Sequence, residues 1–194
     1  MGCWENGEDE SCAQMSGALP QVVLVRHGET AWTVSRQHTG RTDIPLTERG
    51  EREAEALSAR LKSMSFTEVL TSPLQRARRT AELAGFAGCA QAAPDLMEWN
   101  YGAYEGRRTS DIRVERPRWR LFEDGCPGGE TLLEVSARAD RVIARVRALG
   151  GDVLLFAHRD ILRILAVRWV ALSALEARRL YLETASLSVL GCRR

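Results

Sequence analysis

Two short aliphatic runs that each end in a histidine constrain this chain more than any other feature. Residues 21–30 read QVVLVRHGET, and residues 152–158 read DVLLFAH. Runs of this length and composition are typical of buried parallel strands, and both stop where a loop begins. Ligands of open α/β sheets bind beyond the carboxyl ends of such strands. We therefore expect His27 and His158, two of only three histidines, to face one crevice.

A third strand end supplies positive charge. The run TEVLT is followed by SPLQR, which ends at Arg76. Ser72 fits a helix N-cap, Pro73 the first helical position and Gln75 the reciprocal capping partner. Arg76 is then expected in the first helical turn, where free backbone N–H groups favour an anion. Two histidines together with Arg26 and Arg76 around one crevice predict a phosphate pocket.

The composition predicts one globular domain. The chain has 194 residues, of which 44% are hydrophobic and 27% charged, and its net charge is +1. These proportions are ordinary for a globular protein. The balanced charge gives no reason to expect nucleic acid or a membrane surface as a partner, and no apolar run reaches membrane-spanning length. The oligomeric state stays open.

The cysteines indicate a reducing compartment. They are odd in number, widely scattered and without a C-x-x-C pair: Cys3, Cys12, Cys89, Cys126 and Cys192. With so few histidines nearby, this spacing does not suit a zinc site. The N-terminus lacks the basic and apolar regions of a signal peptide. We therefore expect a cytoplasmic protein without a bound metal.

Alternating strands and helices predict an α/β fold, a three-layer α/β/α sandwich with a mostly parallel sheet. Residues 1–19 are polar and aperiodic, which favours a disordered leader before a domain at residues 20–194. Helices are expected at four places: from Leu46-Thr47 to about Met64, from Ser72 to near Gly85, from about Glu130 to Leu149, and from Ile161 onward. Residues 91–97 are a weak strand candidate, and residues 180–182 and 187–190 a terminal hairpin.

The helix at residues 130–149 should bury an apolar stripe formed by Leu133, Ala137, Val142 and Val146. The loop before the first helix, residues 31–45, is long and polar, which is often a sign of function. Within it we interpret His38 as an ordinary loop residue.

Residues 107–129 show no clear period and carry many arginines. Six arginines fall between positions 107 and 120, followed by a turn-rich DGCPGG segment. Two interpretations stay open: a solvated surface segment, or a basic lid over an anionic substrate.

Several motifs together resemble the histidine phosphatase superfamily, which also contains the cofactor-dependent phosphoglycerate mutases. RHGET at residues 26–30, TSPLQRA at residues 71–77, and Glu98 followed by YG and EG pairs match its pattern in order. The resemblance covers about residues 21–192. Segments 38–43, 98–102 and 124–131 are similar to the branch of small acid phosphatases and fungal sedoheptulose bisphosphatase. The short segment between Glu98 and Gly129 favours hydrolysis over mutase activity.

The resemblance implies hydrolysis of small phosphomonoesters, with sugar bisphosphates a reasonable guess, through a phosphohistidine. His27 would attack phosphorus, and the phosphoryl oxygens would be held by Arg26, Arg76 and His158. Glu98 would serve as acid and then as base. The remaining candidates for substrate binding are Thr33, Thr39, Gly40 and Tyr101. No metal or other cofactor is required, and the partner is a small-molecule phosphate ester.

One departure from the family pattern leaves alternatives. The family usually has glycine directly after the second histidine, where Arg159 and Asp160 stand here. Because glycine allows close backbone approach to an anion, Arg159 would either block the pocket or add a phosphate donor. The first case would give a weakened enzyme or a phospholigand-binding protein. Mutase-type phosphoryl transfer is the other alternative.

Overall fold

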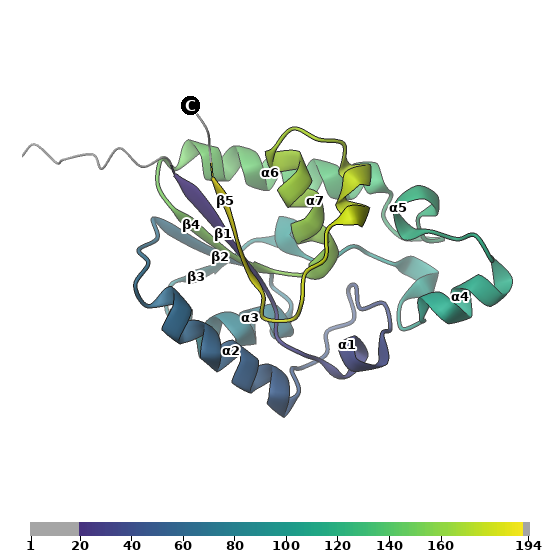
Figure 1. The fold of residues 1–194 in the computed structure, drawn as a ribbon, viewed down its shortest axis with the longest axis horizontal. Helices are drawn as coiled ribbons and strands as arrows, with labels where there is room; N and C mark the ends of the chain where they lie inside the picture. Colours follow the sequence, from purple (N-terminus) through teal and green to yellow (C-terminus); the bar gives the residue numbers. More distant parts are fainter. Residues whose placement is uncertain (1–19, 192–194) are drawn as a thin grey trace, which may run out of the picture.

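The computed structural model describes residues 20–191, so the leader predicted at residues 1–19 lies outside the described residues. Within them, a five-stranded sheet has the order β3-β2-β4-β1-β5 and helices on both faces (Figure 1). The strands are β1 (Gln21–Arg26), β2 (Glu68–Thr71), β3 (Ala90–Ala92), β4 (Val153–Ala157) and β5 (Leu187–Gly191). Only β5 is antiparallel to its neighbour. The predicted three-layer fold is confirmed.

The register of the central strands brings three loops to the same edge of the sheet. Arg26 in β1 pairs with Ala157 in β4, so His27 and His158 follow at the same level. The backbone N–H of His27 donates to Ala157 O at 3.0 Å, and that of Ser72 donates to Phe156 O at 2.9 Å. Parallel strands thus place the ends of β1, β4 and β2 side by side.

Each face of the sheet packs against two main helices. Val23 and Val25 lie in the core formed with α2 (Glu48–Leu61) and α3 (Gln75–Ala81). Val22 and Leu24 lie in the opposite core, formed with α6 (Leu132–Ala148) and α7 (Arg159–Trp169). Strand side chains alternate between the faces, and each fully buried aliphatic side chain stabilises the fold by about 1.5–3 kcal/mol.

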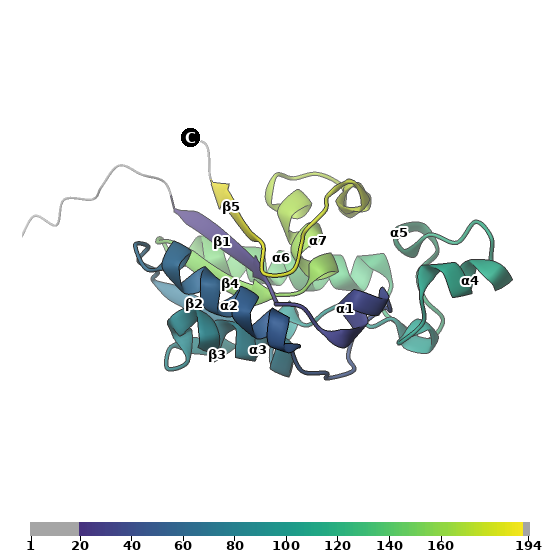
Figure 2. The same ribbon diagram turned by 60° about the horizontal axis from the view of Figure 1, so that its bottom comes forward.

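Short helices complete the fold. They are α1 (Ala31–Ser35), the π-helical turn η1 (Glu82–Phe86), the 3-10 turns η2 (Pro94–Leu96), η3 (Gly102–Tyr104) and η4 (Ala174–Arg179), and the helices α4 (Thr109–Glu115) and α5 (Leu121–Asp124). Figures 1 and 2 place α1, α4 and α5 beyond one end of the sheet. No helix among residues 20–191 is both long and apolar enough to span a bilayer.

The apolar stripe predicted for the helix at residues 130–149 was right at Val142 and Val146 and wrong at Leu133 and Ala137. Leu133 is 79% exposed, and Ala137 is exposed too. The buried face of α6 instead carries Val135, Ser136, Arg138, Ala139, Val142, Ile143 and Val146. A buried arginine interrupts the hydrophobic pattern on this face, and the predicted stripe therefore drifted to its neighbours.

Helix starts differ from the predicted ones by two or three residues. The Ser72 helix starts only at Gln75, and Ser72 accepts a bond from the backbone N–H of Leu74 at 3.3 Å. The last long helix starts at Arg159, with His158 as its N-cap. The predicted capping pair of Ser72 and Gln75 does not form, because α3 begins at Gln75 and Leu74 is its N-cap.

The terminal hairpin was wrong as well. Residues 180–182 form no strand, and residues 187–191 pair with β1 instead. The weak strand at residues 91–97 is confined to β3, followed by the η2 turn. Because Pro94 lacks a backbone N–H, it favours the start of this turn over a longer strand.

The contact between α2 and the loop after β1 depends on glycine. A Cβ at Gly50 would overlap the backbone oxygen of Glu29 and lie 2.7 Å from its nitrogen. Alanine has a higher helix propensity than glycine, by about 1 kcal/mol. Because the added methyl group would overlap the backbone of Glu29, we nevertheless expect Gly50→Ala to lower the free energy of unfolding by about 1–3 kcal/mol in urea titrations. Gly88→Ala, with no atom within 4 Å of its Cβ, is the control. Equal effects of the two changes would contradict this packing.

Candidate active site

A cavity of about 800 Å³ opens beyond the carboxyl ends of β1 and β4. Its wall includes six of the residues predicted for the site: Arg26, His27, Thr33, Thr39, Glu98 and Tyr101. Arg76 and His158 are fully buried and lie next to this wall without lining it. Most predicted residues therefore converge on one place, although in two layers.

His27 is a neutral imidazole with one free nitrogen. Its Nδ1 lies 2.8 Å from Gly28 O, and because a carbonyl can only accept, Nδ1 carries the proton. The lone pair of Nε2 is then free. Burial, followed by the charges of Arg76 and Arg26, holds the pKa of His27 well below its ordinary value. The ring is therefore ready to act as a nucleophile at neutral pH.

His158 lies beside His27, with the ring centroids 5.1 Å apart. Its Nδ1 accepts a bond from Nε of Arg76 at 3.1 Å, and its Nε2 is 2.7 Å from the hydroxyl oxygen of Ser72. These partners place the proton on Nε2. Burial, with the nearby charge of Arg76, lowers the pKa of His158 far below its ordinary value. His158 is thus a fixed neutral donor group.

Arg76 holds the loop that follows α1. Its Nη1 donates to Thr42 O at 3.0 Å, and its Nη2 donates to Gly40 O at 2.8 Å. Together with the bond to His158, these contacts occupy most of its donors. Burial lowers the pKa of Arg76 from its ordinary value, but a guanidinium stays charged in proteins. The group places a fixed positive charge behind the two histidines.

Arg26 reaches the cavity from the last position of β1. Its Nη1 donates to Leu182 O at 2.6 Å, and its buried Nε has no hydrogen-bond partner among residues 20–191. Burial, with the neighbouring charge of Arg159, lowers the pKa of Arg26 to about 10. Arg26 therefore remains charged near neutral pH and keeps a donor free for an anion.

Glu98 lies at the N-terminus of α7. Its Oε1 accepts from the backbone N–H of Ile161 and its Oε2 from that of Asp160, each at 3.0 Å. A carboxylate is favoured at this end of a helix. Burial and the nearby Asp160 nevertheless raise the pKa of Glu98. A carboxyl group with a raised pKa keeps its proton to a higher pH than an ordinary one, which suits a group that first donates and then accepts a proton.

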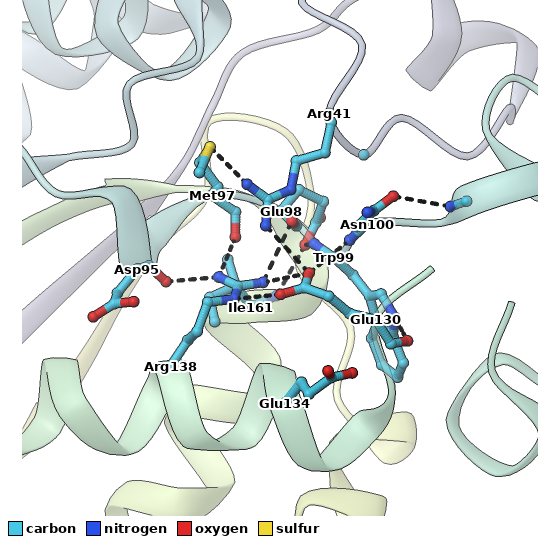
Figure 3. A network of polar contacts seen from close by, with 12 residues as sticks. Arg41, Asp95, Met97, Glu98, Trp99, Asn100, Glu130, Glu134, Arg138 and Ile161 are labelled. Atoms are coloured by element: carbon cyan, nitrogen blue, oxygen red, sulfur yellow. Dashed lines mark hydrogen bonds and ion pairs between the residues drawn. The ribbon is translucent and has the colours of Figure 1, made fainter. Parts of the chain in front are cut away.

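A buried ion-pair network fixes the loop that carries Glu98 (Figure 3). Arg138 of α6 donates to Met97 O and Asp95 O, both at 2.8 Å, and pairs with Glu130 at 2.8 Å. Figure 3 shows the Glu130 carboxylate between Arg138 and Arg41. Burial opposes ionisation of Glu130, yet the bond from Arg138 and others lower its pKa overall. The network sets the backbone on both sides of Glu98.

The residues predicted to bind substrate are mostly committed to local contacts. The hydroxyl of Thr33 donates to Thr30 O at 2.8 Å, and that of Thr39 to Gln37 O at 3.3 Å. Tyr101 donates to Asp160 at 2.6 Å. Gly40 lies outside the cavity wall, and its carbonyl accepts from Arg76. Thr33, Thr39 and Tyr101 nevertheless line the cavity.

Arg159 lines the cavity without filling it. Its Nε and Nη2 donate to the two oxygens of Asp160 at 3.1 and 3.3 Å. Asp160 also accepts from Arg163 at 2.8 Å. Burial raises the pKa of Asp160, but the charges of Arg159 and Arg163 outweigh this effect and hold it below its ordinary value. Arg159 is therefore a fixed cation in the cavity wall.

Sequence reasoning missed one residue and one ion pair at this site. His38 is buried against the Tyr101 ring, 4.9 Å between centroids, and lies in the cavity wall. Burial, with the charge of Arg159, lowers the pKa of His38 to about 4. The Arg138–Glu130 pair was not recognised, although a charged residue on an otherwise apolar helix face is a detectable signal.

Among residues 20–191, no His, Cys, Asp and Glu side chains form a group of three or more suited to a metal.

The Arg138–Glu130 pair should stabilise the fold and the loop that carries Glu98. Arg138→Met keeps the apolar stem but leaves Glu130 and two carbonyls without their main donor, so we expect the free energy of unfolding to fall by about 2–3 kcal/mol. Arg141 lies on the same helix as Arg138 but is exposed, and Arg141→Met removes only its ion pair with Asp95. This change should lower the free energy of unfolding by less than about 0.5 kcal/mol. Denaturant titrations compare the two. Similar losses would refute the buried-network account.

Comparison with known proteins agrees with this geometry. The model of the histidine phosphatase superfamily (branch 1) matches residues 22–194. An acid phosphatase of Mycobacterium tuberculosis is 37% identical, over 88% of this chain and 86% of the relative. Sedoheptulose 1,7-bisphosphatase of Saccharomyces cerevisiae is 36% identical, over 81% of this chain and 70% of the relative.

Two further matches extend the comparison. A Photorhabdus laumondii protein named "Probable phosphoglycerate mutase GpmB" is 39% identical, over 87% of this chain and 83% of the relative. The solved structure of a Mycobacterium tuberculosis open reading frame has a TM-score of 0.85 and 36% identity, and covers 90% of this chain and 92% of that one. The family match and the relatives show that this chain belongs to the histidine phosphatase superfamily, in agreement with its two neighbouring histidines, its buried arginines and the loop that carries Glu98.

Proposed function

We propose that this protein hydrolyses small phosphomonoesters through a phosphohistidine at His27. The observation that carries the proposal is the free Nε2 of a neutral, buried His27 in the wall of a cavity that Arg26 and Arg159 also line. A phosphoryl group in this cavity would meet a nucleophile and fixed positive charges together. Such preorganised charges stabilise the transition state of phosphoryl transfer.

In the first half-reaction, Nε2 of His27 forms a bond to phosphorus as the ester P–O bond breaks. Glu98 donates its proton to the leaving alkoxide, which departs as an alcohol. Arg26 lines the cavity with His27 and would share the negative charge of the phosphoryl oxygens. His158, whose ring lies 5.1 Å from that of His27, would do so by turning its Nε2–H from Ser72 to the phosphoryl group, with Arg76 supporting it from behind. Arginine suits this role because its planar guanidinium can donate two bonds to phosphate.

In the second half-reaction, water attacks phosphorus and the P–N bond breaks. Glu98, now ionised, takes the proton of the water, and orthophosphate leaves with His27 restored as a neutral ring. One carboxyl group thus serves both steps, as its raised pKa favours. The residues Thr33, Thr39 and Tyr101 would contact the rest of the ester. Gly40 would act indirectly, through its carbonyl bond to Arg76.

The substrate would be a small-molecule phosphate ester, because the cavity of about 800 Å³ has the size of a small-molecule site. The arginines of residues 107–120 would suit a second anionic group, which favours a sugar bisphosphate. A cytoplasmic location fits the scattered cysteines and this class of substrate. We propose neither nucleic acid nor a membrane as a partner. Arg159 pairs with Asp160 and leaves the cavity open, which favours a working enzyme over an obstructed binding protein.

Mutase-type phosphoryl transfer is the second candidate, because several similar proteins carry a mutase name. It would use the same phosphohistidine but return the phosphoryl group to a second hydroxyl instead of water. An assay that follows released orthophosphate and phosphoglycerate isomerisation in parallel separates the two.

Replacing His27 should abolish turnover, since no other residue is proposed to carry the phosphoryl group. We expect His27→Ala to release no p-nitrophenol from p-nitrophenyl phosphate above the rate without enzyme. The parent protein, quenched in alkali during turnover, should carry one phosphoryl group on the peptide with His27 in mass spectrometry. Arg52→Ala, an exposed change on α2, is the control. Parental activity in His27→Ala would rule out the phosphohistidine route.

Replacing Glu98 should slow turnover without removing it. Because a positioned acid contributes about 10²–10⁴ in rate, Glu98→Gln should reduce kcat by this factor for alkyl phosphates. The loss of the phosphorylation rate should be smaller for p-nitrophenyl phosphate, whose leaving group needs no proton. In the parent, this rate for alkyl phosphates should fall as pH rises through the raised pKa of Glu98, and the variant should lack this decline. Stopped-flow measurements at several pH values provide the check, and an unchanged pH profile would exclude Glu98 as the acid.

A further inference from the structure

A second cavity, of about 470 Å³, adjoins the first. Arg159, His38 and Thr109 line both cavities, which therefore share a wall. The second cavity has five more arginines in its wall and one acid, and we call it the basic cavity: Arg113, Arg120, Arg163, Arg178 and Arg179, with Glu123.

Four segments build the basic cavity. They are the loop with His38, the region of α4 and α5, the start of α7 and the η4 turn. Fixed contacts hold several of its arginines in place. Arg113 donates to Trp119 O at 3.1 Å, and Arg163 donates to Ala177 O at 2.9 Å while lying over the Phe122 ring.

Positive charge exceeds negative charge around this cavity. Glu123 is shared between Arg120 and Arg178, and Asp160 between Arg159 and Arg163. Arg179 pairs with Glu176, and Arg113 has no carboxylate partner among residues 20–191. Six arginines thus face three carboxylates. A concave surface with an excess of one sign of charge raises the local concentration of the opposite ion.

We propose that the basic cavity binds a second anionic group of the substrate, a phosphate or a carboxylate, while the ester phosphate lies at His27. This inference rests on the proposed function and makes its substrate class narrower: esters that carry a second negative group at a distance. Arg159 lies in the wall that the two cavities share, so it would contact the molecule between its two anionic ends. The arginine in the place of the family's glycine thereby becomes part of substrate selection.

The test compares matched substrates in a double variant. Arg120→Gln with Arg178→Gln removes two cations from the basic cavity and no group that lines the first cavity. For fructose 1,6-bisphosphate we expect KM to rise about tenfold or more, the effect of losing one charge-assisted hydrogen bond, with kcat unchanged. For fructose 6-phosphate, KM should stay within about twofold of the parent, because surface substitutions away from a contact have small effects. Arg52→Gln is the matched control.

Two further experiments show which anionic group is bound and whether the loss comes from misfolding of the variant. The pair 3-phosphoglycerate and glycerol 3-phosphate asks whether a carboxylate also responds, and a response in either pair supports the proposal. The double variant with lysine in both places keeps the charge and should recover most of the loss. If, in both pairs, the two esters change equally in the glutamine variant or neither changes, the basic cavity does not bind the substrate.

A binding measurement separates this inference from the proposed function. In a His27→Ala background, calorimetry should show weaker binding of fructose 1,6-bisphosphate when both arginines are changed, and unchanged binding of orthophosphate. This result without hydrolysis of any ester by the parent would retain the anion site and reject the hydrolase. Normal hydrolysis by the parent, with the same ratio of KM values for the bisphosphate and the monophosphate in the parent and the double variant, would retain the hydrolase and reject the anion site.

Discussion

The parallel pairing of β1 with β4 is the constraint on which the site depends. Because Arg26 lies opposite Ala157, the next residue of each strand is a histidine, and the two rings end 5.1 Å apart. A shift of register by one residue would turn one imidazole to the other face of the sheet. Both strands are buried on both faces, so the hydrophobic cores on either side fix this register. The chemistry at the sheet edge is therefore a consequence of core packing.

The burial of ionisable side chains is the second constraint on the site. Arg76 and Glu98 are both almost fully buried, and each is matched by backbone groups rather than by a direct opposite charge. Carbonyl oxygens surround the guanidinium, and the N–H groups of α7 surround the carboxyl. The carbonyl oxygens hold the Arg76 cation in place without neutralising it, and the N–H groups of α7 fix the orientation of the Glu98 carboxyl group. The Arg138–Glu130 pair supports this arrangement from a distance, because it fixes the backbone that carries Glu98.

The sequence allowed the fold class and the meeting of His27, His158, Arg26 and Arg76 to be predicted, because strand ends in a parallel sheet share an edge. It did not allow the phase of α6 to be predicted, since Arg138 is buried within its apolar face and masks the pattern. The hairpin at residues 180–190 failed for another reason: β1 offered a free edge to residues 187–191, and this longer-range pairing replaced the local one. Nor could the pattern show that Asp160 balances Arg159, because that pairing depends on side-chain directions at the start of α7.

Residues 182–186 also contact His27 and the residue before it. Ala185 donates its backbone N–H to His27 O at 3.1 Å, Arg26 donates its backbone N–H to Ser186 O at 3.2 Å, and the side chain of Arg26 donates to Leu182 O. The segment before β5 thus holds the end of β1 and His27 in place. A nascent chain would lack these bonds until residues 182–186 left the ribosome, so the site can be completed only after they have been synthesised.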